Sequence, residues 1–129
     1  MKLEHIAIWT QDIERLASFY HTYFGATAGD KYTNAAKGFE SRFLKFDAGA
    51  RLEIMCSTAF SPVKYEPGAQ RMGFTHIAIS VGSKRDVDNL TARLHRDGYP
   101  VLEGPRDTGD GYYESIVLDP DGNRLEVTA

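Results

Sequence analysis

The sequence predicts an α+β fold that is built from two tandem copies of one βαβββ module. Three short motifs recur in the same order at nearly constant spacing along the chain. They are His5-Ile6-Ala7-Ile8 with His76-Ile77-Ala78-Ile79, Glu40-Ser41 with Glu114-Ser115, and Arg51-Leu52-Glu53 with Arg124-Leu125-Glu126. One such match could be chance, but three in order favour an internal duplication.

The first copy is expected to consist of a strand, a helix and three further strands. Residues 2–9 alternate and are rich in Ile, Leu and Trp, which is typical of a strand. Asp12 can cap the start of a helix, and Gly25 is placed to end it. The apolar stripe of this helix comprises Ile13, Leu16, Phe19, Tyr20 and Tyr23. The three remaining strands are expected near residues 26–32, 40–47 and 51–56.

The second copy repeats this order. A strand is expected near residues 74–81, followed by a helix that starts with the capping-box residues Ser83 and Asp86. Gly98 is placed to end this helix, because a glycine often follows the last helical turn. Its apolar stripe comprises Val87, Leu90 and Leu94. The last three strands are expected near residues 100–103, 112–118 and 123–128.

The length of 129 residues suits a single domain. We expect its modules at about 1–56 and 74–129, with a connector at 57–73 that contains Pro62, Pro67, Gly68 and Gly73. Neither module alone is long enough to bury a large core.

Composition excludes several classes of protein. The net charge is −3 and no run of like charges occurs, which argues against binding to nucleic acid. The single cysteine, Cys56, excludes an internal disulfide and a CxxC zinc site. No apolar stretch approaches the roughly 20 residues of a membrane span, and residues 1–5 lack the apolar core of a signal peptide. We therefore expect a cytoplasmic protein that binds neither membranes nor nucleic acid.

Each predicted copy carries a His on its first strand and a Glu on its last strand, opposite the aliphatic face of that strand. These four residues are His5, Glu53, His76 and Glu126. They can converge if the two copies are related by a pseudo-twofold axis. Two imidazoles and two carboxylates suit a divalent transition metal, and open coordination positions would make that metal a Lewis acid.

Several other residues have simpler explanations. His21 and His95 lie within the helices without matched partners, so we expect them to be exposed, and Cys56 is expected to be an inert core thiol. Arg51 and Arg124 could bind an anionic substrate, although pairing with carboxylates is favoured. Four large apolar residues could line a pocket, although core packing is the simpler interpretation. The four are Trp9, Phe43, Met55 and Tyr113.

The duplicated module, the two histidine strands and the ending Asp119-Pro120-Asp121-Gly122-Asn123-Arg124-Leu125-Glu126 resemble the glyoxalase, bleomycin-resistance and extradiol-dioxygenase superfamily, also called the vicinal oxygen chelate superfamily. The resemblance covers essentially the whole chain. It implies that paired βαβββ modules form a cup-shaped mixed sheet around a divalent metal, with Ni, Zn, Co, Mn and Fe as candidates. It also implies a homodimer, and leaves open whether the metal lies within one chain or across two.

The four candidate ligands match the His, Glu, His, Glu pattern of glyoxalase I. This likeness implies isomerisation of the hemithioacetal of methylglyoxal and a thiol, through an enediolate. By analogy Glu126 is the base and Glu53 a second acid or base. Trp9 and Thr10 stand where glyoxalase I has an arginine for glutathione, so the sequence does not favour glutathione as the thiol. The alternatives are another metalloenzyme, such as an acyl-CoA epimerase, and a metal-free protein that sequesters a drug.

Overall fold

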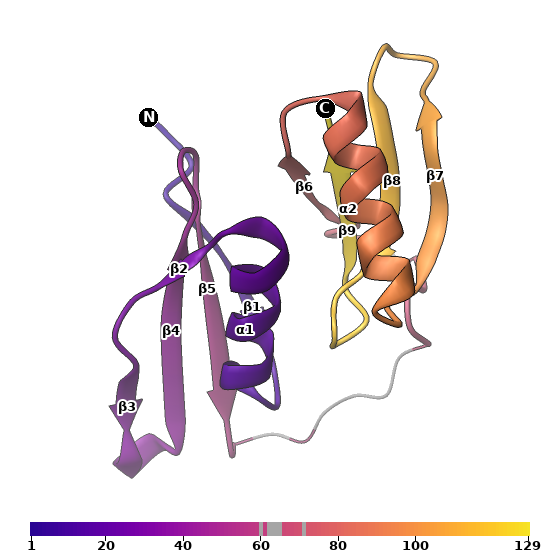
Figure 1. Cartoon of the computed structure of the whole chain (residues 1–129). Coiled ribbons are helices and arrows are strands. Elements are labelled where there is room, and N and C mark those ends of the chain that lie inside the picture. Colours follow the sequence, from indigo (N-terminus) through magenta and orange to yellow (C-terminus); the bar gives the residue numbers. More distant parts are fainter. Residues whose placement is uncertain (60, 62–65, 71) are drawn as a thin grey trace. The chain divides into compact units, whose positions relative to one another are not determined.

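The computed structural model describes residues 1–59, 61, 66–70 and 72–129. The chain divides into two compact units, Met1–Lys64 and Tyr65–Ala129, which we call the first half and the second half. In the described residues each half contains one α-helix and one mixed sheet, so the α+β class expected from the sequence is confirmed (Figure 1). No helix in the described part of the chain has the length and apolar character needed to cross a membrane.

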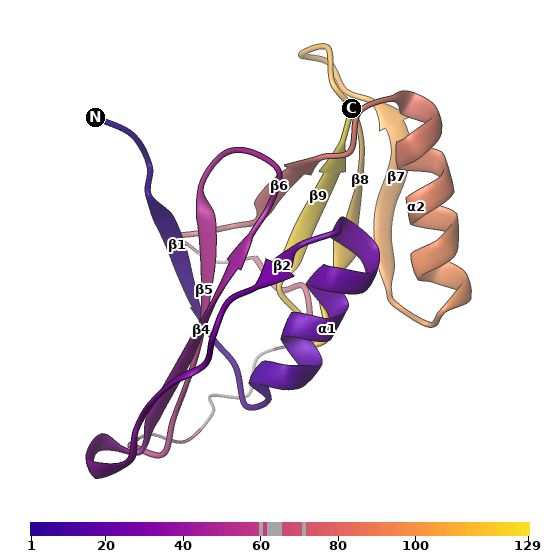
Figure 2. The same cartoon turned by 60° about the vertical axis from the view of Figure 1, so that its left-hand side comes forward.

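The first half has the strand order β1-β5-β4-β2, and β3 pairs with the same edge of β4 as β2 does, at the opposite end of β4. β1 and β5 are parallel, whereas the other neighbours are antiparallel. Figure 2 shows β1 beside β5, with α1 on one side of the sheet. The elements are β1 (His5–Trp9), α1 (Ile13–Phe24), β2 (Thr27–Ala28), β3 (Tyr32–Asn34), the 3-10 turn η1 (Ala35–Lys37), β4 (Phe39–Lys45) and β5 (Arg51–Ser57).

The second half has the strand order β6-β9-β8-β7, and α2 packs against β7, β8 and β9. β6 and β9 are parallel, as β1 and β5 are in the first half, and the other pairs are antiparallel. The two halves therefore share one topology. The elements are β6 (Ile77–Ser80), α2 (Lys84–Arg96), β7 (Val101–Asp107), β8 (Tyr113–Leu118) and β9 (Arg124–Thr128).

Both helices begin and end where the capping residues predict. The Asp12 side chain accepts a hydrogen bond from the backbone N–H of Arg15, and Gly25 ends α1 with a φ of 67°. Ser83 and Asp86 form the expected reciprocal capping box at the start of α2. Gly98 follows α2 with a φ of 92°, a left-handed conformation that glycine adopts without strain.

Each half has its own core between its helix and the facing side of its sheet. In the first half the fully buried residues include Leu16, Tyr20, Leu44 and Ile54. In the second half they include Val87, Leu94, Val117, Leu125 and Val127. Burying each such side chain stabilises the fold by about 1.5–3 kcal/mol. The opposite face of each sheet carries the candidate metal ligands.

Several of the expected strands differ in extent, and the strand expected near 100–103 is β7, which continues to Asp107. The strand expected at 26–32 is two short strands, because Gly29 and Asp30 interrupt it, although the Gly29 N–H still donates to the Phe43 carbonyl at 2.9 Å. β1 starts at His5 rather than at residue 2, and β6 starts at Ile77, one residue after His76. The second histidine therefore precedes its strand rather than lying within it.

The connector expected at 57–73 includes residues 60, 62–65 and 71, which lie outside the described residues. Ser57 belongs to β5, so the last strand of the first half extends into this segment. Gly68, at the start of the second half, is hydrogen-bonded at two points to the segment that ends in β9. Its N–H donates to the Gly122 carbonyl at 3.2 Å, and its carbonyl accepts from Arg124 Nη1 at 2.9 Å.

Candidate metal centre

The first half brings His5 and Glu53 together. Ala7 is the register partner of Glu53 in the parallel pair β1 and β5, so His5 is two residues from that partner on the same face. The distance from His5 Nε2 to Glu53 Oε2 is 3.8 Å, and the side chains are 39% and 16% exposed. The other ring nitrogen, Nδ1, is hydrogen-bonded to Glu4 Oε2. The nitrogen that faces Glu53 is therefore the one that Glu4 leaves free.

The second half repeats this geometry. Ala78 is the register partner of Glu126 in β6 and β9, and His76 precedes Ala78 by two residues. The distance from His76 Nε2 to Glu126 Oε2 is 3.2 Å, with side-chain exposures of 36% and 16%. His76 Nδ1 lies 3.1 Å from the hydroxyl of Thr75, so Nε2 is again the nitrogen directed at the carboxylate.

Both pairs fit the donor requirements of a divalent metal ion. Imidazole nitrogen and carboxylate oxygen bind such ions at about 2.0–2.2 Å, so two ligands of one ion are separated by at most about 4.2 Å. The separations of 3.2 and 3.8 Å satisfy this limit. A partner on Nδ1 is also typical of metal-binding histidines, because it fixes the ring and leaves Nε2 for the metal.

Within the described ranges the donors come as these two pairs. No group of three or more His, Cys, Asp or Glu side chains is placed to hold a metal ion there. The convergence of all four predicted ligands on one ion therefore stays a prediction.

Arg51 pairs with a carboxylate, as the favoured interpretation expected. Its Nε donates to Glu4 Oε1 at 2.8 Å and its Nη2 contacts the same oxygen. The hydrogen bond from His5 holds the pKa of the Glu4 carboxyl below its ordinary value, and the Arg51 hydrogen bond and charge act in the same direction, against partial desolvation. Arg124 does not meet this expectation, because its Nη1 donates to the Gly68 carbonyl at 2.9 Å instead.

Glu114, on β8, is a third carboxylate beside Glu126 that the sequence interpretation did not single out. It is only 8% exposed and lies on the same face of the sheet as Glu126, which is on the adjacent strand β9. Burial raises the pKa of Glu114, and the hydrogen bond and charge of Glu126 raise it further, while Arg106 at 3.8 Å opposes the shift. The one available signal was a carboxylate inside the otherwise mostly apolar strand of residues 113–118.

The matched Glu-Ser pairs of the two copies are not structurally equivalent. Ser41 is the register partner of Met55, two residues after Glu53, whereas Glu114 is the partner of Thr128, two residues after Glu126. Glu114 therefore corresponds to Ser41, and the motif match is displaced by one residue. Neighbouring residues of a strand lie on opposite faces of the sheet, so Glu40, one residue before Ser41, lies on the helix side.

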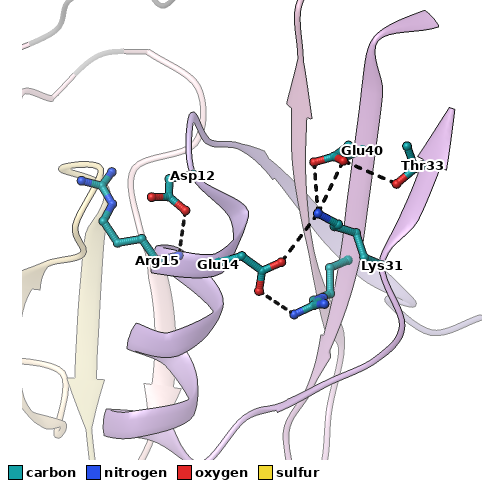
Figure 3. Close-up of polar contacts among 7 residues, drawn as sticks. Asp12, Glu14, Arg15, Lys31, Thr33 and Glu40 are labelled. Atoms are coloured by element: carbon teal, nitrogen blue, oxygen red, sulfur yellow. Dashed lines mark hydrogen bonds and ion pairs between the residues drawn. The ribbon is translucent and has the colours of Figure 1, made fainter. Parts of the chain in front are cut away.

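Figure 3 shows this helix-side position of Glu40. Lys31 lies between two carboxylates, with its Nζ 3.8 Å from Glu14 Oε1 and 3.4 Å from Glu40 Oε1. Glu14 also accepts a hydrogen bond from Arg42 Nη1 at 2.9 Å. This network joins the start of α1 to β4 and lies on the opposite face from Glu53.

None of the four large apolar residues considered for a pocket is buried, so the core interpretation was wrong. Trp9 is 48% exposed, and the other three are half-buried. Trp9, Phe43 and Met55 lie on the Glu53 face of the first sheet. Met55 follows Glu53 by two residues on β5, Trp9 is the register partner of Met55, and Phe43 is the register partner of Glu53. Tyr113 lies on the helix side instead, where its hydroxyl donates to Asp88 at 2.7 Å.

The remaining expectations concern His21, His95 and Cys56. Both histidines are exposed, as expected, and His21 Nδ1 contacts the Ala26 carbonyl at 3.0 Å. Cys56 lies on the helix side as predicted, but it is half-buried and not in the core. It is the last residue but one of β5.

A family model described as the Glyoxalase/Bleomycin resistance protein/Dioxygenase superfamily matches residues 2–127. The chain therefore belongs to this superfamily. An uncharacterized Bacillus subtilis protein, YqjT, is 27% identical over 130 residues, which cover 98% of either chain.

Solved structures share the fold. A possible glyoxalase from Bacillus cereus is 26% identical, with a TM-score of 0.73 over 100% of this chain and 99% of that one. The trypanothione-dependent glyoxalase I of Leishmania major is 22% identical, with a TM-score of 0.78 over 99% of this chain and 86% of that one. The second likeness concerns the fold alone.

Proposed function

We propose that the protein is a divalent-metal lyase or isomerase of the glyoxalase I type. The observation that carries the proposal is the repeated pair, in which an imidazole Nε2 faces a carboxylate at 3.8 Å in one half and 3.2 Å in the other. The four residues that would hold one metal ion are His5, Glu53, His76 and Glu126. When bound, the ion supplies Lewis acidity that stabilises negative charge on two neighbouring substrate oxygens.

The substrate is a hemithioacetal of methylglyoxal and a thiol, and the chain's own carboxylates move its protons. Glu126 removes the proton from the carbon that bears sulfur and returns it to the neighbouring carbon, while Glu53 transfers the hydroxyl proton from the first oxygen to the second. The product is a 2-hydroxyacyl thioester, so the step is an internal redox change that needs no outside oxidant or reductant. Glu114, a buried carboxyl on the neighbouring strand β8, helps to hold that carboxylate in position.

The thiol in this proposal is not glutathione. Trp9 presents an exposed indole on the same face as His5, and Phe39 packs edge-to-face against it at 6.2 Å. Thr10 is 8% exposed and its hydroxyl accepts from the Asp12 N–H at 3.1 Å, so it is occupied by the start of α1. This end of the face suits an apolar thiol better than one that carries carboxylates.

The test combines elemental analysis with two assays. Purified protein is reconstituted with Ni, Co, Zn or Mn, and metal content is measured for the wild type, His5→Gln, His76→Gln and the control His95→Gln. The proposal expects one metal ion per site, which the first two variants lose and the control keeps. Hemithioacetals of several thiols and an acyl-CoA epimerisation substrate are then assayed with the loaded protein.

Each result has a defined meaning. Turnover of a hemithioacetal supports the proposed reaction, whereas epimerisation alone would indicate an acyl-CoA epimerase instead. Failure to retain any metal would contradict both reactions and favour a protein that sequesters a ligand.

A further inference from the structure

The side chains around His5 form a closed circuit of four members. Glu4 holds His5 Nδ1 with one carboxylate oxygen and the Arg51 guanidinium with the other. Arg51 stacks over the Phe43 ring, with its Cζ 4.0 Å from the ring centroid. The Phe43 ring meets the His5 ring edge-to-face at 5.3 Å, with 90° between their planes. Each member is thus held by two others.

The backbone reinforces this circuit. The Arg51 N–H donates to the Glu4 carbonyl at 3.0 Å, so the residue before β1 is tied to the start of β5. Glu4 is therefore fixed through both its main chain and its side chain. A carboxylate fixed on two sides can orient an imidazole more strictly than one on a free side chain.

No such circuit surrounds His76 among the described residues of the second half. Thr75 and Ile116 stand at the positions that correspond to Glu4 and Phe43, as the pairing with β9 shows. Thr75 offers a neutral hydroxyl to His76 Nδ1 at 3.1 Å, and Arg124 donates to the Gly68 carbonyl rather than to Thr75. A hydrogen bond to a charged group is roughly twice as strong as one between neutral groups. His76 is accordingly held less firmly than His5.

We propose that Glu4 is a positioning residue that fixes the Nδ1–H tautomer and the ring orientation of His5, and that the first half is thereby the preorganised half of the metal site. The part of this inference that concerns the metal rests on the proposed function. The Nε2 lone pair of His5 is presented to an ion without reorganisation. His76 needs more ordering when it binds, and the second half keeps more freedom for its carboxylates.

The experiment compares three variants of the full chain. Glu4→Gln keeps the size of the side chain and removes its charge, and Thr75→Val removes the corresponding hydroxyl in the second half. Glu14→Gln is the matched control, because it also removes an exposed carboxylate that pairs with an arginine, but on the helix side (Figure 3). Glu4 precedes β1 and its side chain is 50% exposed, so the substitution leaves the core intact.

The first readout needs no metal. Long-range ¹⁵N–¹H NMR spectra at about pH 9, where free imidazoles are neutral, report which ring nitrogen of His5 carries the proton. We expect Nδ1–H in the wild type and in Glu14→Gln, with a shift toward Nε2–H in Glu4→Gln. An Nε2–H tautomer in the wild type, or an unchanged one in Glu4→Gln, overturns the assignment of Glu4.

The second readout is the affinity for Co²⁺, measured by calorimetry. We expect Glu4→Gln to weaken binding about 10-fold or more, as loss of an outer-shell partner does, and Thr75→Val to weaken it less. Equal affinities of Glu4→Gln and the wild type would overturn the preorganised first half while the proposed metal site stood. Absence of Co²⁺ binding by the wild type would overturn the metal site itself, and the tautomer spectra would still decide the role of Glu4.

Discussion

Ser41 and Glu114 occupy corresponding positions in the two halves. Ser41 pairs with the residue two places after Glu53, and Glu114 pairs with the residue two places after Glu126. Both are buried, at 4% and 8% exposure, yet one is a hydroxyl and the other a carboxylate. The two halves thus carry the same His–Glu pair in different surroundings. Glu126 has a neighbouring carboxyl group to its side, whereas the position beside Glu53 is neutral.

Substitution of Glu126 by Gln should abolish turnover and preserve the fold. An amide cannot accept the substrate proton, and loss of a general base lowers the rate by about 10²–10⁴-fold. The measurement is hemithioacetal isomerisation by the metal-loaded protein, with circular dichroism to monitor folding. Asp88→Asn, which removes an exposed carboxylate of α2 in the same half, serves as the control. Unchanged turnover in Glu126→Gln would remove this residue from the mechanism.

Stability should depend on pH through Asp119, which is 3% exposed. Burial raises the pKa of Asp119 above its ordinary value, while hydrogen bonds from Asn123 and from the Asp121 N–H partly oppose the shift. The folded state therefore retains the proton to higher pH than the unfolded state does, and the free energy of unfolding falls as pH rises through the interval between the two pKa values.

The variant Asp119→Asn isolates this contribution, because an amide does not titrate. We expect the stability of the wild type relative to this variant to fall as pH rises from about 4, the ordinary value of an aspartate, and then to become constant. Urea unfolding at a series of pH values measures the difference. A difference that grows with pH would show that the hydrogen bonds outweigh burial.

A buried hydroxyl pair joins α2 to β8 and should show coupling. Thr91 Oγ1 donates to the Val87 carbonyl at 2.7 Å and lies 2.6 Å from Ser115 Oγ, which is fully buried. Thr91→Val leaves the Ser115 hydroxyl without a partner, at a cost of about 1–3 kcal/mol. Adding Ser115→Ala should recover part of that loss. Strictly additive losses in urea unfolding would contradict the coupling.

Gly68→Ala should destabilise the second half more than Gly25→Ala destabilises the first. Both glycines have a left-handed φ, 73° and 67°, so an alanine costs about 1–2 kcal/mol at either position. A Cβ on Gly68 would also lie 2.8 Å from Leu102 Cδ1 and 3.3 Å from Leu118 Cδ2, whereas a Cβ on Gly25 meets nothing within 4 Å. Equal losses in thermal unfolding would show that the leucines move aside without cost.

Much of the fold could be predicted because its signals are local. Asp12, Gly25 and Ser83 mark helix ends through hydrogen bonds with residues nearby in the chain, and both helices begin where they indicate. The placement of a His and a Glu of each half opposite the aliphatic face followed from strand alternation, which needs no long-range information. Their proximity within a half depends on the parallel pairing of β1 with β5 and of β6 with β9. The repeated motifs fixed which strands correspond.

The remaining features depend on register and on distant partners. The displaced match of Glu40 with Glu114 shows that similarity of two letters does not identify a face, because one residue of slip reverses it. The hydrogen bond from Arg124 to Gly68 and the burial of Glu114 depend on which segments meet in space. Core packing was wrongly expected for Trp9 because its hydrophobicity says nothing about whether a helix covers its side of the sheet.

The parallel pairing of the first and last strands in each half has a consequence for how the candidate site comes into being. β5 lies between β1 and β4, and β9 lies between β6 and β8, so each sheet is completed by the strand that a ribosome makes last in that half. Such pairing closes a long loop and is slow compared with local contacts. Glu53 and Glu126 are carried on these two strands. A nascent chain would thus display each imidazole before its carboxylate arrives, and each His–Glu pair would form only as its half finishes folding.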